Sequence, residues 1–297
     1  MAFKLPNLNP ARLRSYVFRL PLCTRVILLI IVALWTASIF HPGLRQTCAL
    51  VPDQVSITAG KSADDRMQIH LAQPRFLLTL WCCAAFRLNT FPVTHVGFFH
   101  ALFNLLAIAP LLERFEAEHG TLVSFALFSG PFATIPGLLY IIIERGILRG
   151  NTAVQGASVW VFLLLAVEAM KTHKANPYFS LGPYKIPTWT TPLMLILVTS
   201  FLVPNTSLIG HLCGAFVGYL WGLNYIKFLA PPEKILRWIE SKLNLLARLP
   251  HYVSVDRSTF GRYGVLPSTT PLSTLPSGMV GSTQRLDAFV YLLRLVR

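Results

Sequence analysis

The sequence predicts an all-α membrane protein, a bundle of six transmembrane helices followed by a cytosolic and largely disordered tail. Three observations lead to this class. Hydrophobic residue types make up 54% of the 297 residues and charged types only 13%, against roughly 45–50% and 25% in soluble domains. Several long stretches contain no Asp, Glu, Lys or Arg, and basic residues flank them. An ordinary soluble enzyme is therefore excluded, and the lipid bilayer is the expected surrounding.

The remaining charge is strongly basic, with 26 Lys and Arg against 12 Asp and Glu, which gives a formal net charge of +14. Cationic flanks of membrane spans account for this excess. Basic clusters interleaved with aromatic residues do not occur, so no nucleic-acid partner is predicted. The five cysteines are odd in number and lack the spacing of a metal site. We therefore expect neither a disulfide framework nor a metal, and no cofactor.

Six spans are predicted from the charge-free stretches, because a charged side chain at bilayer depth costs about 2.5–3.5 kcal/mol on insertion scales. The longest stretch, 186–226, is divided in two by a turn signal at 204–207. Each span is close to the roughly 20 residues that a hydrocarbon core requires, with the fifth at the short end. The apolar run 76–86 is too short to span and predicts an interfacial or re-entrant helix. The spans are placed near 25–40, 93–112, 122–143, 153–170, 190–203 and 207–226.

These spans divide the chain into three parts. Residues 1–24 are predicted as a cytosolic N-terminal segment, 25–229 as the membrane domain and 230–297 as a cytosolic tail. Basic residues before the first span, between spans four and five, and after span six fall on one side, which makes that side cytosolic and places both termini there. Arg145 and Arg149 are the exceptions on the opposite side. Spans two, four and six therefore enter the membrane from the lumen or exterior.

The tail differs in character from the membrane domain. Residues 233–249 place leucines and isoleucines on one helical face and basic residues elsewhere, which is typical of an amphipathic helix on an anionic leaflet. Residues 254–284 are rich in Ser, Thr, Pro and Gly and are expected to be disordered. Residues 285–297 fit a second short basic helix.

A few polar residues remain inside or near the predicted spans. They are His95, His100 and Asn104 on span two, Ser158 on span four and His211 on span six. Taken singly, an intramembrane serine most simply bonds its own helix backbone, and structural hydrogen bonding explains the others as well as function does. Taken together they share one depth. At a rise of 1.5 Å per residue, Ser158 and His211 are expected roughly 6–8 Å below the starts of two spans that run in the same direction.

This set of groups suits hydrolysis by a serine nucleophile. A serine hydroxyl needs a base to remove its proton, and histidine is the usual base near neutral pH, so His211 is expected to activate Ser158. The oxyanion of the tetrahedral intermediate needs donors, which Asn104, His100 and the backbone N–H at Ser158 supply. No intramembrane Asp is placed to orient the histidine, and Glu168 lies near the opposite end of span four. The expected site is a Ser–His dyad rather than a triad.

Small residues explain how two of the spans come close enough for this chemistry. Gly214, Gly218 and Gly222 form one stripe on span six, the small-xxx-small pattern that permits backbone contact between helices. Gly156 and Ala157 precede the serine on span four. Span four is therefore the expected partner of the stripe, which brings the histidine of span six beside the serine.

These motifs, in this order on spans two, four and six, resemble the rhomboid family of intramembrane serine proteases. The resemblance covers roughly residues 86–225 and implies a six-span rhomboid bundle. Gly-Ala-Ser at 156–158 is similar to the family's Gly-x-Ser, which implies that Ser158 is the nucleophile. Gly-His-Leu-Cys-Gly-Ala-Phe-Val-Gly at 210–218 is similar to the family's GHxxGxxxG, which implies that His211 is the base.

Further positions match the family around the second span. His100-Ala-Leu-Phe-Asn104 is similar to its His-x-x-x-Asn, which implies that both residues stabilise the oxyanion. His95 falls where many members carry another histidine. The matches that imply structural roles are Arg87 for the Arg of the Trp-Arg loop motif, with Phe86 in place of Trp; Glu116 and Gly120 for the Glu and Gly after span two; and Gly156, Gly214 and Gly218 as motif glycines.

Val159 is a departure from the family pattern, because most members have glycine directly after the nucleophile. A β-branched side chain there is expected to crowd the oxyanion pocket or narrow the substrate groove. The departure keeps open an alternative, a rhomboid-like pseudoprotease that binds membrane clients and hands them to a cytosolic partner. The retained Ser158 and His211 favour the enzyme. A transporter or channel fits less well, since the spans hold few ionisable residues.

Six spans, two cytosolic termini and a long Ser/Thr/Pro-rich tail resemble the fungal Golgi or endosomal members of the family. This resemblance implies a Golgi or endosomal membrane and cleavage of the transmembrane segments of single-span proteins, among them membrane-anchored transcription factors. Tails of that group recruit an AAA-ATPase through a short Phe/Gly/Leu motif, to which residues 260–266 are loosely similar. A solvated linker is the competing explanation for that segment.

Overall fold

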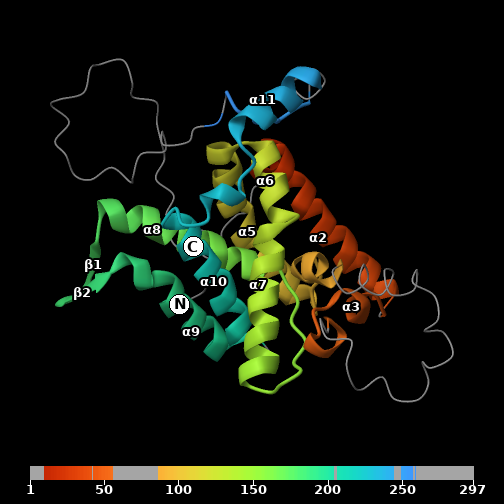
Figure 1. Cartoon of the computed structure of the whole chain (residues 1–297), viewed down its shortest axis with the longest axis vertical. Coiled ribbons are helices and arrows are strands. Elements are labelled where there is room, and N and C mark those ends of the chain that lie inside the picture. The colour runs from red at the N-terminus through yellow and green to blue at the C-terminus, as the bar shows by residue number, and fades with distance from the viewer. Residues whose placement is uncertain are drawn as a thin grey trace.

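The computed structural model of the chain describes residues 10–41, 43–55, 86–203, 206–243, 249–256 and 258. These residues are mainly helical (Figure 1). Several predictions fall outside the described residues. They concern nearly all of the helix at 76–86, nearly all of the disordered segment 254–284, the helix at 285–297 and the motif at 260–266.

Helices occupy each of the six predicted span positions. They are α2 (Leu22–Phe40), α5 (Phe98–His119), α6 (Thr121–Phe128) continued by α7 (Pro131–Ile141) and the π-helical turn η3 (Ile142–Ile147), α8 (Ser158–Ala175), α9 (Thr191–Leu202) and α10 (Leu208–Gly222). Within the described part of the chain, three helices are long and apolar enough to cross a membrane, at Leu22–Phe40, Phe98–His119 and Thr121–Ile147. A fourth is added if α10 and Lys227–Lys242, bent by 93°, form one span. The chain is an integral membrane protein, and the full set of six spans stays a prediction.

Shorter elements connect and extend these helices. They are α1 (Pro10–Val17), α3 (Gly43–Cys48), η1 (Pro52–Val55), η2 (Phe91–Val93), β1 (Tyr178–Leu181), β2 (Tyr184–Pro187), η4 (Thr188–Thr190), η5 (Lys227–Leu229) and α11 (Glu233–Lys242). β1 and β2 form an antiparallel hairpin that the sequence analysis did not predict, with Tyr178 opposite Pro187. Gly182 has a φ of +61° in its turn, a conformation that glycine adopts without strain.

α8 lies at the centre of the bundle, in contact with α5, α7, α9 and α10 (Figure 1). Most of its residues between 159 and 170 are buried, as expected for an apolar helix enclosed by others. The indole N–H of Trp160 donates to the carbonyl of Phe132 at 3.1 Å. Near the C-terminal end of α8, Glu168 pairs with Arg114 of α5 at 3.0 Å. The charges of α8 are therefore placed at the end farthest from its serine.

α8 and α10 are parallel and in backbone contact. A Cβ added at Gly214 would overlap the carbonyl oxygen of Val159, and one at Gly218 would overlap that of Leu163. The two contacts are four residues apart on both helices, so one turn of each helix matches one turn of the other. Any side chain larger than hydrogen would push the helices apart. Span four is thus the partner that the glycine stripe predicted.

Two helices begin later than the predicted spans. α5 starts at Phe98 and α8 at Ser158, instead of near 93 and 153. Gly156 explains the second difference, because its φ of +123° is incompatible with a helix and its N–H donates to the carbonyl of Phe91 at 2.8 Å. Ser158 is therefore the first residue of its helix, not several residues below the start as the spacing predicted. His211 is the fourth residue of α10.

Glu116 organises the opposite end of the bundle, where α2 begins and α5 ends. Its fully buried carboxylate accepts hydrogen bonds from the N–H groups of Cys23 at 2.8 Å and Thr24 at 2.7 Å. The hydroxyls of Thr24 and Thr121 donate to it at 2.8 and 2.7 Å. Because the first N–H groups of a helix lack intrahelical acceptors and favour an anion, this carboxylate caps α2. Gly120, with a φ of +92°, ends α5 and allows the chain to turn into α6.

α11 covers 233–242 of the helix predicted at 233–249, of which 244–248 lie outside the described residues. It is fastened to the bundle. Leu236 lies in the hydrophobic core, although the sequence placed it on a face toward a lipid leaflet. Ile235 and Trp238 are exposed instead. The Glu240 carboxylate accepts hydrogen bonds from the Tyr252 hydroxyl at 2.7 Å and from the Val255 N–H at 3.0 Å. The amphipathic pattern of this helix therefore serves packing on its Leu236 side.

The segment 249–256 returns to the bundle and packs on it. The N–H of Leu22, at the start of α2, donates to the carbonyl of His251 at 3.0 Å. The N–H of Thr121 donates to the carbonyl of Val253 at 2.9 Å, and the N–H of Val253 donates to the Thr121 hydroxyl at 2.9 Å. In this part of the chain the tail is an ordered component of the membrane domain, and the predicted disorder does not hold at 254–256.

Candidate active site

Ser158 lies where the loop 150–157 enters α8. The N–H groups of Ser158 and Val159 have no carbonyl one turn earlier within the helix, and the helix dipole makes this end positive. Backbone donors of this kind stabilise negative charge that develops during acyl transfer. The serine hydroxyl is therefore attached to a helix end that is suited to an oxyanion.

His211 lies on α10 at the level of this serine. A Cβ at Gly210 would lie 3.0 Å from the Val154 side chain, on the loop before the serine, and Gly214 contacts Val159 directly after it. The histidine lies between these two glycines in sequence. The parallel register of α8 and α10 thus brings His211 to the N-terminal end of α8.

Packing against Phe162 holds the His211 ring. The ring of Phe162, one turn after Ser158, lies against it with centroids 4.5 Å apart. Nδ1 of His211 is buried without a hydrogen-bond partner among the described residues, and no hydrogen bond joins His211 to Ser158 there. Such catalytic bonds are often long without substrate and shorten in the complex. The sequence analysis missed Phe162, which its spacing of four residues from the serine would have revealed.

His95 and His100 pack around the backbone that precedes the serine. Nε2 of His95 accepts the N–H of Ala157 at 3.1 Å. The His100 ring lies on Gly156, where a Cβ would be 2.9 Å from the ring Nε2 and 3.7 Å from the Ser158 hydroxyl oxygen. The two rings meet edge to face with centroids 5.1 Å apart. His100 is therefore close to the serine hydroxyl, whereas His95 holds the peptide group in front of it.

Asn104 lies one turn beyond His100 on α5 and is buried. Its side-chain nitrogen donates to the carbonyl of His100 at 2.7 Å. An amide nitrogen carries two hydrogens, so this contact leaves one donor for a further acceptor. The structure places Asn104 on the same helix as His100, which itself touches the loop before the serine.

Val159 points into the contact between α8 and α10. Only 3% of its surface is exposed, and its Cγ2 lies 3.1 Å from the position of a Cβ at Gly214. The β-branched side chain therefore fills space that the glycine of α10 leaves open. The expected crowding of the oxyanion pocket does not follow from this orientation.

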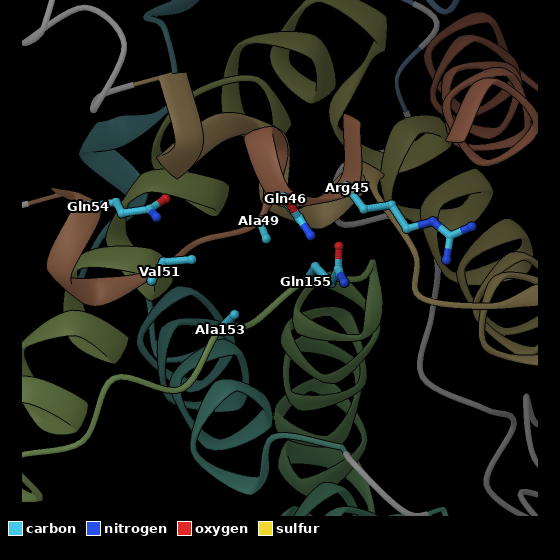
Figure 2. A pocket seen from close by; sticks show the side chains of 7 residues that line it. All are labelled: Arg45, Gln46, Ala49, Val51, Gln54, Ala153 and Gln155. Atoms are coloured by element: carbon cyan, nitrogen blue, oxygen red, sulfur yellow. The ribbon is translucent and has the colours of Figure 1, made fainter. Parts of the chain in front are cut away.

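The loop 150–157 pairs with the chain near η1 through an isolated β-bridge. Val154 exchanges both backbone hydrogen bonds with Leu50, at 3.0 and 2.9 Å. Ala153 and Gln155, on alternate positions, line a recess of about 290 Å³ together with Arg45, Gln46, Ala49, Val51 and Gln54 (Figure 2). Its lining includes neither the candidate serine nor the candidate histidine. The recess lies beside the loop that leads to the site.

Arg87 supports the chain segment on the other side of this recess. Its Nη1 donates to the carbonyls of Gln46 at 2.8 Å and Ala49 at 2.6 Å. Arg45 in turn donates to the carbonyl of Val96 at 2.7 Å, next to His95. These two guanidinium groups fasten α3 to the segment that carries the histidines.

The arrangement offers a hydroxyl, an imidazole and backbone donors at one place, which are the parts of nucleophilic acyl transfer. The described ranges contain no group of three or more His, Cys, Asp or Glu side chains that could hold a metal ion.

Comparison with known proteins gives a consistent match. The family model described as Rhomboid domain matches residues 83–228. Rhomboid-type serine protease B of Aspergillus fumigatus is 54% identical over 94% of this chain and 95% of the relative. Rhomboid-type serine protease 2 of Gibberella zeae is 50% identical over 95% of this chain and 98% of the relative. The protein of the same name in Neurospora crassa is 50% identical over 94% of both chains.

Proposed function

Because the chain belongs to the rhomboid family of serine proteases, we propose that it is an intramembrane serine endopeptidase with Ser158 as nucleophile and His211 as general base. The observation that carries this assignment is the backbone contact of α8 and α10, which brings the two residues to one level. The resemblance of the motifs at 156–158 and 210–218 supports the same pair.

The reaction uses the groups around the start of α8. The Ser158 hydroxyl attacks the scissile carbonyl while His211 takes its proton. The resulting oxyanion receives hydrogen bonds from the backbone N–H at Ser158, His100 and Asn104. His211 then protonates the leaving amine, and water hydrolyses the acyl-enzyme with His211 again acting as base. The unpartnered Nδ1 of His211 supports a dyad in which Phe162 replaces a carboxylate as the orienting group.

Exposed apolar side chains beside the site support the proposed substrate class. α5 packs on α2, α6 and α8, while α9 packs on α8 and α10, and the outer faces of α5 and α9 carry exposed large apolar side chains. Examples are Phe98, Phe99 and Phe103 on α5 and Leu197 and Phe201 on α9. We propose that the transmembrane helix of a single-span protein docks beside these two helices. It unwinds near the N-terminal end of α8, because a helical segment buries its carbonyls in its own hydrogen bonds.

Topology, location and partners extend this proposal. Basic residues favour two cytosolic termini, which places Ser158 and His211 toward the lumen or exterior. A Golgi or endosomal membrane, a membrane-anchored transcription factor as substrate and an AAA-ATPase bound to the tail rest on the resemblance to the fungal members alone.

Labelling with a fluorophosphonate probe tests the nucleophile. The purified protein is expected to react at Ser158, and Ser158→Ala and His211→Ala are expected to lose both labelling and cleavage of a co-expressed single-span protein. Ser124→Ala is the matched control, since Ser124 bonds the Gly120 carbonyl of its own helix at 2.9 Å and is expected to react normally. Undiminished labelling of Ser158→Ala would overturn the assignment. A client-binding pseudoprotease predicts no labelling of the wild-type protein, which separates the two functions.

A further inference from the structure

The C-terminal end of the third predicted span, at η3, holds a buried carboxylate that the proposed mechanism does not use. Glu144 lies in the π-helical turn η3 and is 5% exposed. A buried carboxylate is costly unless it is hydrogen-bonded, and Oε1 of Glu144 accepts the backbone N–H of Thr152 at 3.1 Å. The backbone carbonyl of the same residue accepts the N–H of Gly150 at 2.8 Å. Glu144 therefore binds Gly150 and Thr152, at the start of the loop that leads to Ser158.

Two further contacts show how closely span three and the start of this loop pack together. A Cβ added at Gly150 would lie 2.5 Å from the Glu144 carboxylate oxygen, so a side chain there would displace either the carboxylate or the loop. Tyr140, one turn earlier on α7 and buried, donates its hydroxyl to the carbonyl of Thr152 at 2.7 Å. Both backbone groups of Thr152 are thus bound by side chains of span three.

From this anchor to the serine, the loop is bound at alternate residues. Val154 pairs with Leu50, and the N–H of Gly156 donates to the carbonyl of Phe91 at 2.8 Å. Alternate binding fixes the register of an extended segment, because a slip of one residue reverses the side on which each group points. Ser158 is six residues after Thr152, a distance of at most about 20 Å along the chain. A slip at the anchor would move the serine by about 3.3 Å.

We propose that Glu144, together with Tyr140, is a positioning residue of the active site that sets the register of the loop 150–157 and so places Ser158 beside His211. The proposal rests on the proposed function, because it requires Ser158 to be the nucleophile. Span three contributes no group to the dyad, and it acts on the reaction through this loop. Displacements of about 1 Å in reacting groups cost on the order of 100-fold in rate, so loss of the anchor has a large effect on chemistry and a small one on substrate docking.

The test compares Glu144→Ala with Glu144→Gln in the full-length protein in detergent and in liposomes. Glutamine keeps an acceptor oxygen at the same distance, and it is expected to retain most of the fluorophosphonate labelling rate. Alanine is expected to lower that rate and kcat by about 10–100-fold, with KM within twofold. The probe needs no docked helix, so its rate reports on Ser158 and His211 rather than on substrate binding. The melting temperature of each variant gives the folded fraction to which rates are normalised.

A second pair of variants keeps the test independent of the loss of Glu144. Gly150→Ala retains the carboxylate but pushes the loop off it, and it is expected to lower the labelling rate by about 3–10-fold. Gly146→Ala, in the same turn, is the matched control, because a Cβ there meets nothing within 4 Å. Equal labelling rates for Gly150→Ala and Gly146→Ala would overturn the inference. A labelling rate of Glu144→Ala within twofold of wild type would also overturn it. So would equal losses of labelling rate in Glu144→Ala and Glu144→Gln. Labelling of Ser158→Ala would instead overturn the proposed function.

Discussion

Two buried polar groups at opposite ends of the bundle differ in how fully they are hydrogen-bonded. The Glu116 carboxylate accepts four hydrogen bonds from α2 and Thr121. The His211 imidazole is packed against Phe162, and its Nδ1 has no partner among the described residues. A satisfied buried group stabilises the fold, whereas an unsatisfied one costs stability and stays available for a substrate. The stabilising carboxylate and the candidate active site therefore lie at opposite ends of the bundle.

Glu116→Ala is expected to have the largest effect on stability. It leaves the N–H groups of Cys23 and Thr24 and the Thr121 hydroxyl without their acceptor, at a cost of about 3–5 kcal/mol. Thermal unfolding in detergent measures it. Glu113→Ala is the control, because the Glu113 carboxylate accepts the Tyr16 hydroxyl at 2.9 Å and does not cap a helix. Equal destabilisation by the two variants would mean that the cap on α2 contributes no more to stability than a single hydrogen bond does.

Gly218→Ala is expected to have the next largest effect on stability. It is expected to lower the labelling rate as well. Its Cβ would overlap the Leu163 carbonyl, so α8 and α10 must separate, at a cost of about 1–3 kcal/mol. The separation also moves His211 away from Ser158, and the fluorophosphonate labelling rate falls more than the folded fraction does. Gly43→Ala, where a Cβ meets nothing within 4 Å, is expected to leave both quantities unchanged. A labelling rate that follows the folded fraction alone would contradict the prediction.

Replacing the unsatisfied group sharpens the contrast. His211→Leu removes an imidazole whose Nδ1 is unpaired and keeps an apolar side chain against Phe162, so the free energy of unfolding is expected to change by less than about 1 kcal/mol. Labelling and cleavage are expected to disappear. Melting temperature and labelling are measured on the same preparation. A loss of stability as large as that of Glu116→Ala would show that His211 is a structural residue.

The smallest expected effect is in the docked tail. Tyr252→Phe removes the hydrogen bond from a buried phenol to Glu240, at a cost of about 1 kcal/mol. Burial, and then the bond to Glu240, raise the pKa of the Tyr252 phenol. The folded state therefore holds this proton more tightly, and stability falls as pH rises above the ordinary tyrosine value of about 10. Asp256→Asn, at an exposed ion pair with Arg237, is the control and is expected to leave the melting temperature unchanged. A pH dependence unchanged in Tyr252→Phe would contradict this assignment.

The sequence predicts the helices well where composition alone decides them. Charge-free stretches located α2, α5, α9 and α10, because a buried charge is costly in any arrangement of the bundle. The glycine stripe at Gly214 and Gly218 predicted the partner of α10, since close approach depends on the absence of a side chain. These features are local, and they can be recognised in the sequence without knowledge of the rest of the fold.

The contacts that set the site are not local and could not be read from the sequence. The start of α8 depends on the φ of Gly156 and on its bond to Phe91, 65 residues earlier in the numbering. The orientation of Val159 follows from a glycine on another helix. The spacing alone therefore placed Ser158 too deep, and the effect of Val159 on the substrate groove stays a prediction. The roles of Ser158 and His211 themselves stay predictions until the probe experiment is done.

The bond between Leu22 and His251 also sets an order of events during synthesis. The first span enters the membrane long before residue 251 leaves the ribosome, so the N-terminal end of α2 is complete only after the last span and α11 have been made. A chain truncated after α10 would therefore lack a hydrogen-bond acceptor at the N-terminal end of α2. Deletions in the C-terminal tail that reach residue 253 should be interpreted as changes to the helical bundle itself.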